Sequence, residues 1–280
     1  MKITKMTTFA LLVVLAACNF PSPGRQSPTP TDSLTSSPPP RASATMPPAV
    51  PSPTSTSGSM EPEEAILILE PGPGSRLTSP IHVAGIADPT FEQTIVVRIV
   101  LDDGSELTIH PLTIAADIGQ RGPFEGDVPF SVDGERHALI QVFDQSARDG
   151  GIVHLASMGV ILLSEGPEEI VSFAPHPEVI VIFQPESGAT IRGGVVHVEG
   201  FGLASFEQTF VIKVYDAEGN VVGSQPIIVQ APDWGIPGPF SADVPYEVEE
   251  EGPGRIVVID ALPVFDGVGH ISSVEVTLAP

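Results

Sequence analysis

The 280-residue chain is poor in cysteine, in positive charge and in helix-compatible composition. Its single cysteine excludes an intrachain disulfide and a zinc site built from thiolates. Its 27 Gly and 31 Pro residues, about a fifth of the chain, argue against a helical protein. The 12 Lys and Arg residues are outnumbered by 35 Asp and Glu residues, which gives a formal net charge of −23. Because such a surface repels phosphates, we exclude nucleic acid as a partner.

The first apolar run of the chain is too short to cross a membrane. Residues 9–15 are apolar and follow a positively charged start, whereas a transmembrane helix needs about 20 residues. We therefore interpret residues 1–17 as a signal peptide. The only cysteine, Cys18, follows a Leu-Ala-Ala tripeptide, and this pattern resembles the lipobox of bacterial lipoproteins. The resemblance implies cleavage before Cys18 and a diacylglycerol on its thiol; the alternative is an ordinary secretory signal.

Residues 18–62 have the composition of a disordered linker. Of the 42 residues from 19 to 60, 27 are Pro, Ser or Thr, and few of the others are apolar. Such a segment cannot offset its loss of chain entropy by burying apolar surface. Its prolines favour an extended backbone. We predict a stalk that carries the rest of the chain.

An internal repeat organises the chain beyond residue 62. Three motifs recur at an offset of 115 or 116 residues: Phe-Glu-Gln-Thr, His-Val-x-Gly and Gly-Pro-Phe. Their first residues are Phe91 and Phe206, His82 and His197, and Gly122 and Gly238. The repeat predicts two tandem domains, 65–164 and 178–280, joined by a short, stiff linker rich in Glu and Pro.

Each copy shows the two-residue period of β-strands. In residues 94–101 three Ile and Val side chains fall on one face and Arg98 on the other, and residues 209–215 repeat the alternation. Glycine-containing turns at 102–105 and 216–220 indicate hairpins. About seven short strands in about 100 residues, without a helical period, predict an immunoglobulin-like sandwich. The expected fold class is all-β, with two tandem sandwiches.

A set of short motifs occurs in the same order in both copies. In the first copy it comprises Pro71, Gly74, Ser79-Pro80, Gly85, Phe91-Glu92, Asp102 with Gly104, and Pro123-Phe124. In the second copy it comprises Pro185, Gly188, Gly200, Phe206-Glu207, Asp216 with Gly219, Trp234 and Pro239-Phe240. This set resembles the Gmad2 family, the immunoglobulin-like domain named from bacterial spore-germination proteins. The resemblance implies an extracytoplasmic β module, often carried by a lipoprotein, without established catalysis.

The chain contains no motif of a known catalytic site. Gly-x-Ser-x-Gly, His-Glu-x-x-His and a phosphate-binding glycine loop are all missing from the sequence. We therefore predict no enzymatic activity and no cofactor. Three aromatic residues, Phe91, Phe206 and Trp234, admit either a contact site or a structural role. We predict that Phe91 and Phe206 fill the cores and that Trp234 caps an edge of the second sandwich.

Four histidines occupy repeat-related positions: His82, His197, His154 and His270. A transition metal would require His82 to converge with His154 in the first copy, and His197 with His270 in the second. We favour duplicated surface or hydrogen-bonding histidines and predict no metal site. Calcium at the acidic loops 144–149 and 260–266 is the other candidate, although neither loop has calcium-ligand spacing.

These features predict a lipid-anchored binding or structural protein on the extracytoplasmic face of a bacterial cell membrane. Its two modules would face an envelope protein or a polysaccharide, and the family resemblance suggests a link to sporulation or germination. The alternative is a solute- or ion-capturing lipoprotein that serves a transporter. The two predicted sandwiches are not the hinged α/β lobes that are usual in such proteins, which argues against this alternative.

Overall fold

The computed structural model describes residues 62–263 and 267–280 of the chain. The predicted signal peptide, Cys18 and nearly all of the predicted stalk lie outside these residues. The described residues include no helix long and apolar enough to cross a membrane.

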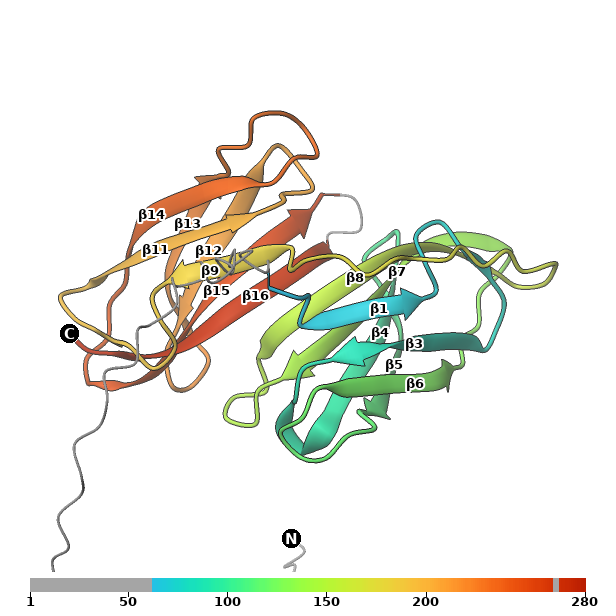
Figure 1. Ribbon diagram of the computed structural model, residues 1–280, viewed down its shortest axis with the longest axis horizontal. Helices are drawn as coiled ribbons and strands as arrows, with labels where there is room; N and C mark the ends of the chain where they lie inside the picture. Colours follow the sequence, from blue (N-terminus) through green and yellow to red (C-terminus); the bar gives the residue numbers. More distant parts are fainter. Residues whose placement is uncertain (1–61, 264–266) are drawn as a thin grey trace, which may run out of the picture. The chain divides into compact units, whose positions relative to one another are not determined.

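Two β-sandwiches with the same order of strands make up the described part of the chain (Figure 1). The strands of the first are β1 (Ile66–Glu70), β2 (Arg76–Leu77), β3 (Ile81–Ala87), β4 (Thr94–Leu101), β5 (Glu106–Thr113), β6 (Gly122–Val128), β7 (Glu135–Gln145) and β8 (Ile152–Leu163). Those of the second are β9 (Ile180–Gln184), β10 (Thr190–Ile191), β11 (Val195–Gly202), β12 (Thr209–Tyr215), β13 (Val221–Ile228), β14 (Gly238–Pro245), β15 (Gly252–Leu262) and β16 (Gly267–Leu278). The predicted all-β fold with two tandem immunoglobulin-like sandwiches is confirmed.

Each sandwich packs a three-stranded layer against a layer of four long strands, in which β8 or β16 also pairs in parallel with the short strand β2 or β10. In the first copy, strands β1-β3-β6 pack against β5-β4-β7-β8, and in the second, β9-β11-β14 pack against β13-β12-β15-β16. The alternation predicted for residues 94–101 is present, with Ile95, Val97 and Ile99 fully buried. The predicted hairpin glycines Gly104 and Gly219 both have a positive φ, near 80°. Local alternation and turn chemistry thus produce the same core twice.

A glycine–phenylalanine contact explains why two of the motifs recur together. Gly85 pairs with Phe124 across β3 and β6, and Gly200 pairs with Phe240 across β11 and β14. A Cβ atom on Gly85 would lie 2.2 Å from the backbone oxygen of Leu67 and 2.5 Å from the Phe124 ring. Only glycine leaves room for the ring at this point of the sheet.

The two sandwiches share one continuous sheet. Strands β8 and β16 pair antiparallel, with Ala156 opposite His270 and Leu155 opposite Ile271, and join the two four-stranded layers. Strand β7 pairs with β8 as far as Gln145 opposite Ile152. A small apolar core lies between the copies, formed by Phe143, Leu155, Val257, Ile259 and Ile271.

Two predictions about aromatic side chains are wrong. Phe91 is 62% exposed and Phe206 44% exposed, so neither fills a core. The buried residue of the first motif is Gln93, whose Nε2 donates to the carbonyl of Gln120 at 3.0 Å and holds the 116–120 loop. Trp234 is 71% exposed and caps nothing. Counting apolar residues does not distinguish these positions, which lie outside the strands, from core positions. The two-residue alternation that marks a buried face ends where the strand ends.

The linker between the copies lies along the first sandwich. Val171 accepts a hydrogen bond from Gly72 N–H at 3.0 Å and donates its own N–H to Ser75 Oγ at 2.9 Å. Glu169 pairs with Arg76 in an isolated antiparallel bridge. These contacts tie the linker to the first sandwich as far as Val171.

Candidate functional site

Four polar side chains meet where the two sandwiches join. They are Glu64, His154, Glu178 and His270, and one potential ligand atom from each lies within 4.8 Å of all the others. His154 lies on β8 and His270 on β16, and the two glutamates stand just before β1 and β9. We call this group the seam cluster. Each sandwich contributes one Glu and one His to it.

The cluster consists of two tight Glu–His pairs that also approach each other. His154 Nε2 lies 2.8 Å from Glu64 Oε1, and His270 Nε2 lies 2.9 Å from Glu178 Oε1. The crossed distances, from His154 Nε2 to Glu178 and from His270 Nε2 to Glu64, are both 3.8 Å. The two imidazole rings meet edge to face with centroids 4.9 Å apart. The arrangement has an approximate two-fold symmetry that follows from the duplication.

Backbone N–H groups exchanged between the copies hold the carboxylates in place. Ala65 N–H donates to Glu178 Oε2 at 3.0 Å, and Val179 N–H donates to Glu64 Oε2 at 3.2 Å. The segments that carry them pair antiparallel at Glu63, opposite Pro177. Each glutamate is therefore oriented by the chain of the other copy, and the cluster exists only when both copies are in contact.

The cluster is withdrawn from solvent, and its charges depend on one another. The side chains of Glu64, His154, Glu178 and His270 are 0%, 11%, 9% and 5% exposed. Burial would lower the pKa of His154, but the hydrogen bond with Glu64 and the charges of both glutamates outweigh burial and raise it. Burial would raise the pKa of Glu178, but the hydrogen bond with His270 and the two imidazoles lower it. The surroundings therefore favour the protonated form of His154 and the ionised form of Glu178.

A second polar contact joins the copies away from the cluster. Arg255 on β15 is 1% exposed, and its Nη2 donates to Asp149 Oδ2 at 2.7 Å. Its guanidinium also lies 5.7 Å from the centre of the Tyr215 ring. Burial would raise the pKa of Asp149, but hydrogen bonds from Gly151 N–H and Arg255 outweigh burial and lower it to about 2. This ion pair reinforces the seam.

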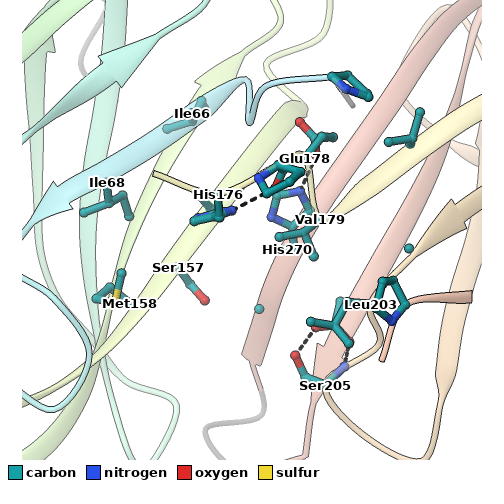
Figure 2. Close-up of a pocket in the computed structure, with 18 of the residues that line it drawn as sticks. Ile66, Ile68, Ser157, Met158, His176, Glu178, Val179, Leu203, Ser205 and His270 are labelled. Carbon is teal, nitrogen blue, oxygen red and sulfur yellow. Dashed lines mark hydrogen bonds and ion pairs between the residues drawn. The ribbon is translucent and has the colours of Figure 1, made fainter. Parts of the chain in front are cut away.

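An apolar groove of about 810 Å³ opens beside the seam cluster (Figure 2). Ile66 and Met158 of the first sandwich and Phe183 and Phe201 of the second line it, together with the cluster residue His270. Phe183 is 53% exposed and Phe201 37% exposed. Glu178 also lines the groove, so the cluster is reached from it. Both copies line the groove, and its exposed apolar side chains Phe183 and Phe201 belong to the second copy.

The four repeat-related histidines have two different kinds of surroundings in the structure. His82 and His197 lie on outer strand faces as predicted, and each pairs with an aspartate, Asp127 at 3.0 Å and Asp243 at 2.7 Å. The histidines of one copy do not converge: His82 does not meet His154, and His197 does not meet His270. His154 approaches the partner histidine of the other copy, because β8 and β16 are the strands that pair across the seam.

Sequence reasoning did not identify the two glutamates of the cluster. Glu64 and Glu178 stand 114 residues apart, each immediately before the first strand of its copy, and this repeat was the available signal. The acidic loops considered for calcium have other partners: Asp149 binds Arg255, and Asp260 accepts a hydrogen bond from Ser205 N–H at 3.0 Å. Residues 264–266 of the second loop lie outside the described residues.

Comparisons with known proteins agree with the duplication. The model of the family Gmad2, described as the immunoglobulin-like domain of bacterial spore germination, matches residues 65–151 and again 179–262. No curated protein sequence matches the chain.

Solved structures with partial likeness have little sequence in common with the chain. They include dimeric latent PorU from Porphyromonas gingivalis, at 15% identity over 83% of this chain and a TM-score of 0.30, and red sea bream transglutaminase, at 7% identity over 77% and a TM-score of 0.26. Domain CBD12 of CALX1.2 shows 11% identity over 76% of this chain and 99% of its own, with a TM-score of 0.19. This chain spans 21% of PorU and 31% of the transglutaminase.

Proposed function

Because this chain belongs to the Gmad2 family, the immunoglobulin-like domain of bacterial spore germination, we propose that it is a non-catalytic binding protein of the bacterial surface. A lipid on Cys18 anchors it to the extracytoplasmic face of the cell membrane. The Pro-, Ser- and Thr-rich stalk then carries the paired sandwiches away from the bilayer. The lipobox-like sequence before Cys18 and the composition of residues 18–62 support this anchoring.

The observation that carries the proposal is the groove shared by the two sandwiches. Phe183 and Phe201 are exposed side chains that line a groove of about 810 Å³, and residues of β8 and β16 line it as well. Exposed apolar side chains gathered around a concave surface mark binding sites. Because β8 and β16 pair, the two walls of the groove are held together.

We expect the groove to bind a polypeptide segment of an envelope protein. Its apolar walls suit aliphatic and aromatic side chains better than the hydroxyl-rich surface of a polysaccharide. Beyond residue 60 the chain has 34 acidic and 8 basic residues, a net charge of 8 − 34 = −26. Such a surface attracts a segment flanked by basic residues. The Asp and Glu residues would therefore guide the approach, and the groove would hold the apolar part.

Site-specific photocrosslinking in cells tests this proposal. A photoreactive side chain at Phe201 or Phe183 should crosslink one envelope protein, and the same group at Val221 should not. Val221 is the matched control because it is also apolar and 50% exposed but does not line the groove. Equal products at all three positions, or attachment to polysaccharide alone, would contradict the proposed protein ligand.

A further inference from the structure

We propose that Glu64, His154, Glu178 and His270 form a four-coordinate site for a divalent transition metal, with zinc as the best match. The metal would clamp the two sandwiches together at their seam. This inference is independent of the lipid anchor and of the ligand of the groove.

The donor atoms fit zinc better than they fit harder cations. Two imidazole nitrogens and two carboxylate oxygens converge, and zinc accepts both kinds of donor and favours four ligands in tetrahedral geometry. Calcium and magnesium prefer shells made of oxygen alone, with six or more ligands for calcium. The seam cluster has no thiolate because the single cysteine of the chain lies at position 18. The donor set therefore favours a divalent ion of intermediate softness, one that accepts imidazole nitrogen as well as carboxylate oxygen.

The distances between the donors are those of a nearly formed tetrahedron. Zinc–ligand bonds of about 2.0–2.2 Å place tetrahedral donors about 3.3–3.6 Å apart. In the seam cluster, the two paired nitrogen–oxygen distances are 2.8 and 2.9 Å, and the crossed distances, from His270 Nε2 to Glu64 Oε1 and from His154 Nε2 to Glu178 Oε2, are both 3.8 Å. One ligand atom from each of the four residues lies within 4.8 Å of all the others. Small rotations of these side chains would bring the donors to tetrahedral spacing.

The charge of the site also suits a divalent cation. A transition metal binds imidazole in its neutral form and carboxylate in its ionised form, so the four ligands together carry −2 in the bound state. A single M²⁺ ion neutralises that charge in a cluster that is almost wholly withdrawn from solvent. The ion would take the place of the protons of the two Glu–His hydrogen bonds.

The groups around the donors act as an outer shell. The second oxygen of each glutamate accepts a backbone N–H from the other copy, from Ala65 and from Val179. Such contacts fix the direction in which a carboxylate presents its ligand atom. Glu178 and His270 line the groove, which offers an ion a path from solvent. Because each copy supplies one Glu and one His, the bound ion would connect them directly.

Zinc titration of the full chain provides the main test. The protein is a tag-free Cys18→Ser variant, which removes the lipid anchor and the only thiol, and it is first stripped with a chelator. Isothermal titration calorimetry should show one zinc per chain with sub-micromolar affinity, and zinc should raise the melting temperature more than equal concentrations of Mg²⁺ or Ca²⁺ do. Absence of saturable zinc binding, or an equal rise with Mg²⁺, would overturn the proposal.

Two sets of variants connect the binding to the seam cluster. In Glu178→Gln the shape of the side chain is kept, and in His154→Ala with His270→Ala both imidazoles are lost. Each should weaken zinc binding by more than the ~10–100-fold that loss of an outer-shell partner costs. The matched control removes His82 and His197, which are also repeat-related and paired with acids but exposed. It should bind zinc as the parent does; equal loss in the control would overturn the site.

Spectroscopy of the protein with its cluster intact avoids dependence on folding of the variants. Zinc X-ray absorption should show two imidazoles and a remaining shell of oxygen at about 2.0–2.2 Å. Co²⁺ in place of zinc should give the intense visible absorption of a tetrahedral centre. A spectrum with no imidazole, or the weak bands of octahedral Co²⁺, would refute a tetrahedral site in the cluster.

Discussion

His154 and His270 are 116 positions apart in the chain, yet their imidazole rings touch edge to face with centroids 4.9 Å apart. They are equivalent residues of two copies of one domain, and they meet because β8 and β16, the strands that carry them, pair across the seam. Duplication followed by edge-to-edge pairing has thus made one buried cluster from two half-sites. Similar half-sites are present in both copies, and neither is complete alone.

The first prediction concerns the stability of the seam cluster without metal. Glu64→Ala removes a carboxylate that is 0% exposed and leaves His154 without its partner. We expect a loss of about 3–5 kcal/mol in the free energy of unfolding, because a buried charge then lacks compensation. Urea unfolding in a chelator-containing buffer measures the loss. The comparable exposed pair is His82 with Asp127, where Asp127→Ala should cost only ~0–1 kcal/mol. Equal losses in the two variants would show that burial does not matter here.

The second prediction concerns the packing of Phe124 on glycine. In Gly85→Ala the new Cβ would lie 2.2 Å from a backbone oxygen and 2.5 Å from the Phe124 ring, so the sheet must shift. We expect destabilisation of at least about 1–3 kcal/mol in thermal or urea unfolding. Gly159→Ala on β8 is the control, because a Cβ there would meet nothing within 4 Å. A similar small effect at both sites would contradict the packing argument.

The third prediction concerns acid and the Asp149–Arg255 pair. The pKa of Asp149 is lowered from 3.8 to about 2, so its ionised form stabilises the fold. That contribution, of about 2 kcal/mol by linkage, is complete above the ordinary carboxyl pKa of about 4 and is lost as the pH falls toward 2.

Comparison with Asp149→Asn isolates this effect from the other carboxylates. The parent should be the more stable protein at neutral pH, and the difference in unfolding free energy should decrease between about pH 4 and pH 2. Denaturant unfolding at a series of pH values measures it. A difference that persists unchanged at pH 2 would mean that Asp149 does not titrate as described.

The fourth prediction concerns the membrane anchor. Cys18→Ser removes the only thiol that can carry a diacylglycerol, so the protein should leave the membrane fraction. Fractionation of cells followed by an alkaline wash measures this. Complete retention of the variant with the washed membranes would show that another element holds the chain there.

The fifth prediction concerns the independence of the two sandwiches. Fragments 61–165 and 176–280 each keep a full core of their own, so each should unfold cooperatively. Separation exposes the apolar side chains of the seam, including Leu155 and Ile271, so each fragment should melt at a lower temperature than the whole chain. Calorimetry of the three proteins measures it. Two disordered fragments would mean that the sandwiches fold only as a pair.

The sequence by itself determined the strands, the turns and the duplication. Alternation in residues 94–101 and glycine in the hairpin turns are local properties, and local properties survive in any fold that contains those strands. The repeated His-Val-x-Gly and Gly-Pro-Phe motifs predicted the duplication, and in the structure Gly85 and Phe124 of these motifs pair in adjacent strands. The all-β class and the tandem arrangement followed from these features.

The tertiary structure alone decided which residues meet at the seam and which side chains remain exposed. Whether His154 approaches His82 or His270 depends on which strand edges pair, and the choice is made by contacts between residues more than 100 positions apart. The exposure of Trp234 was decided in the same way, by whether any distant segment covers its loop. The strand period carries no information on either point, because it describes one strand at a time and not the surface against which it packs.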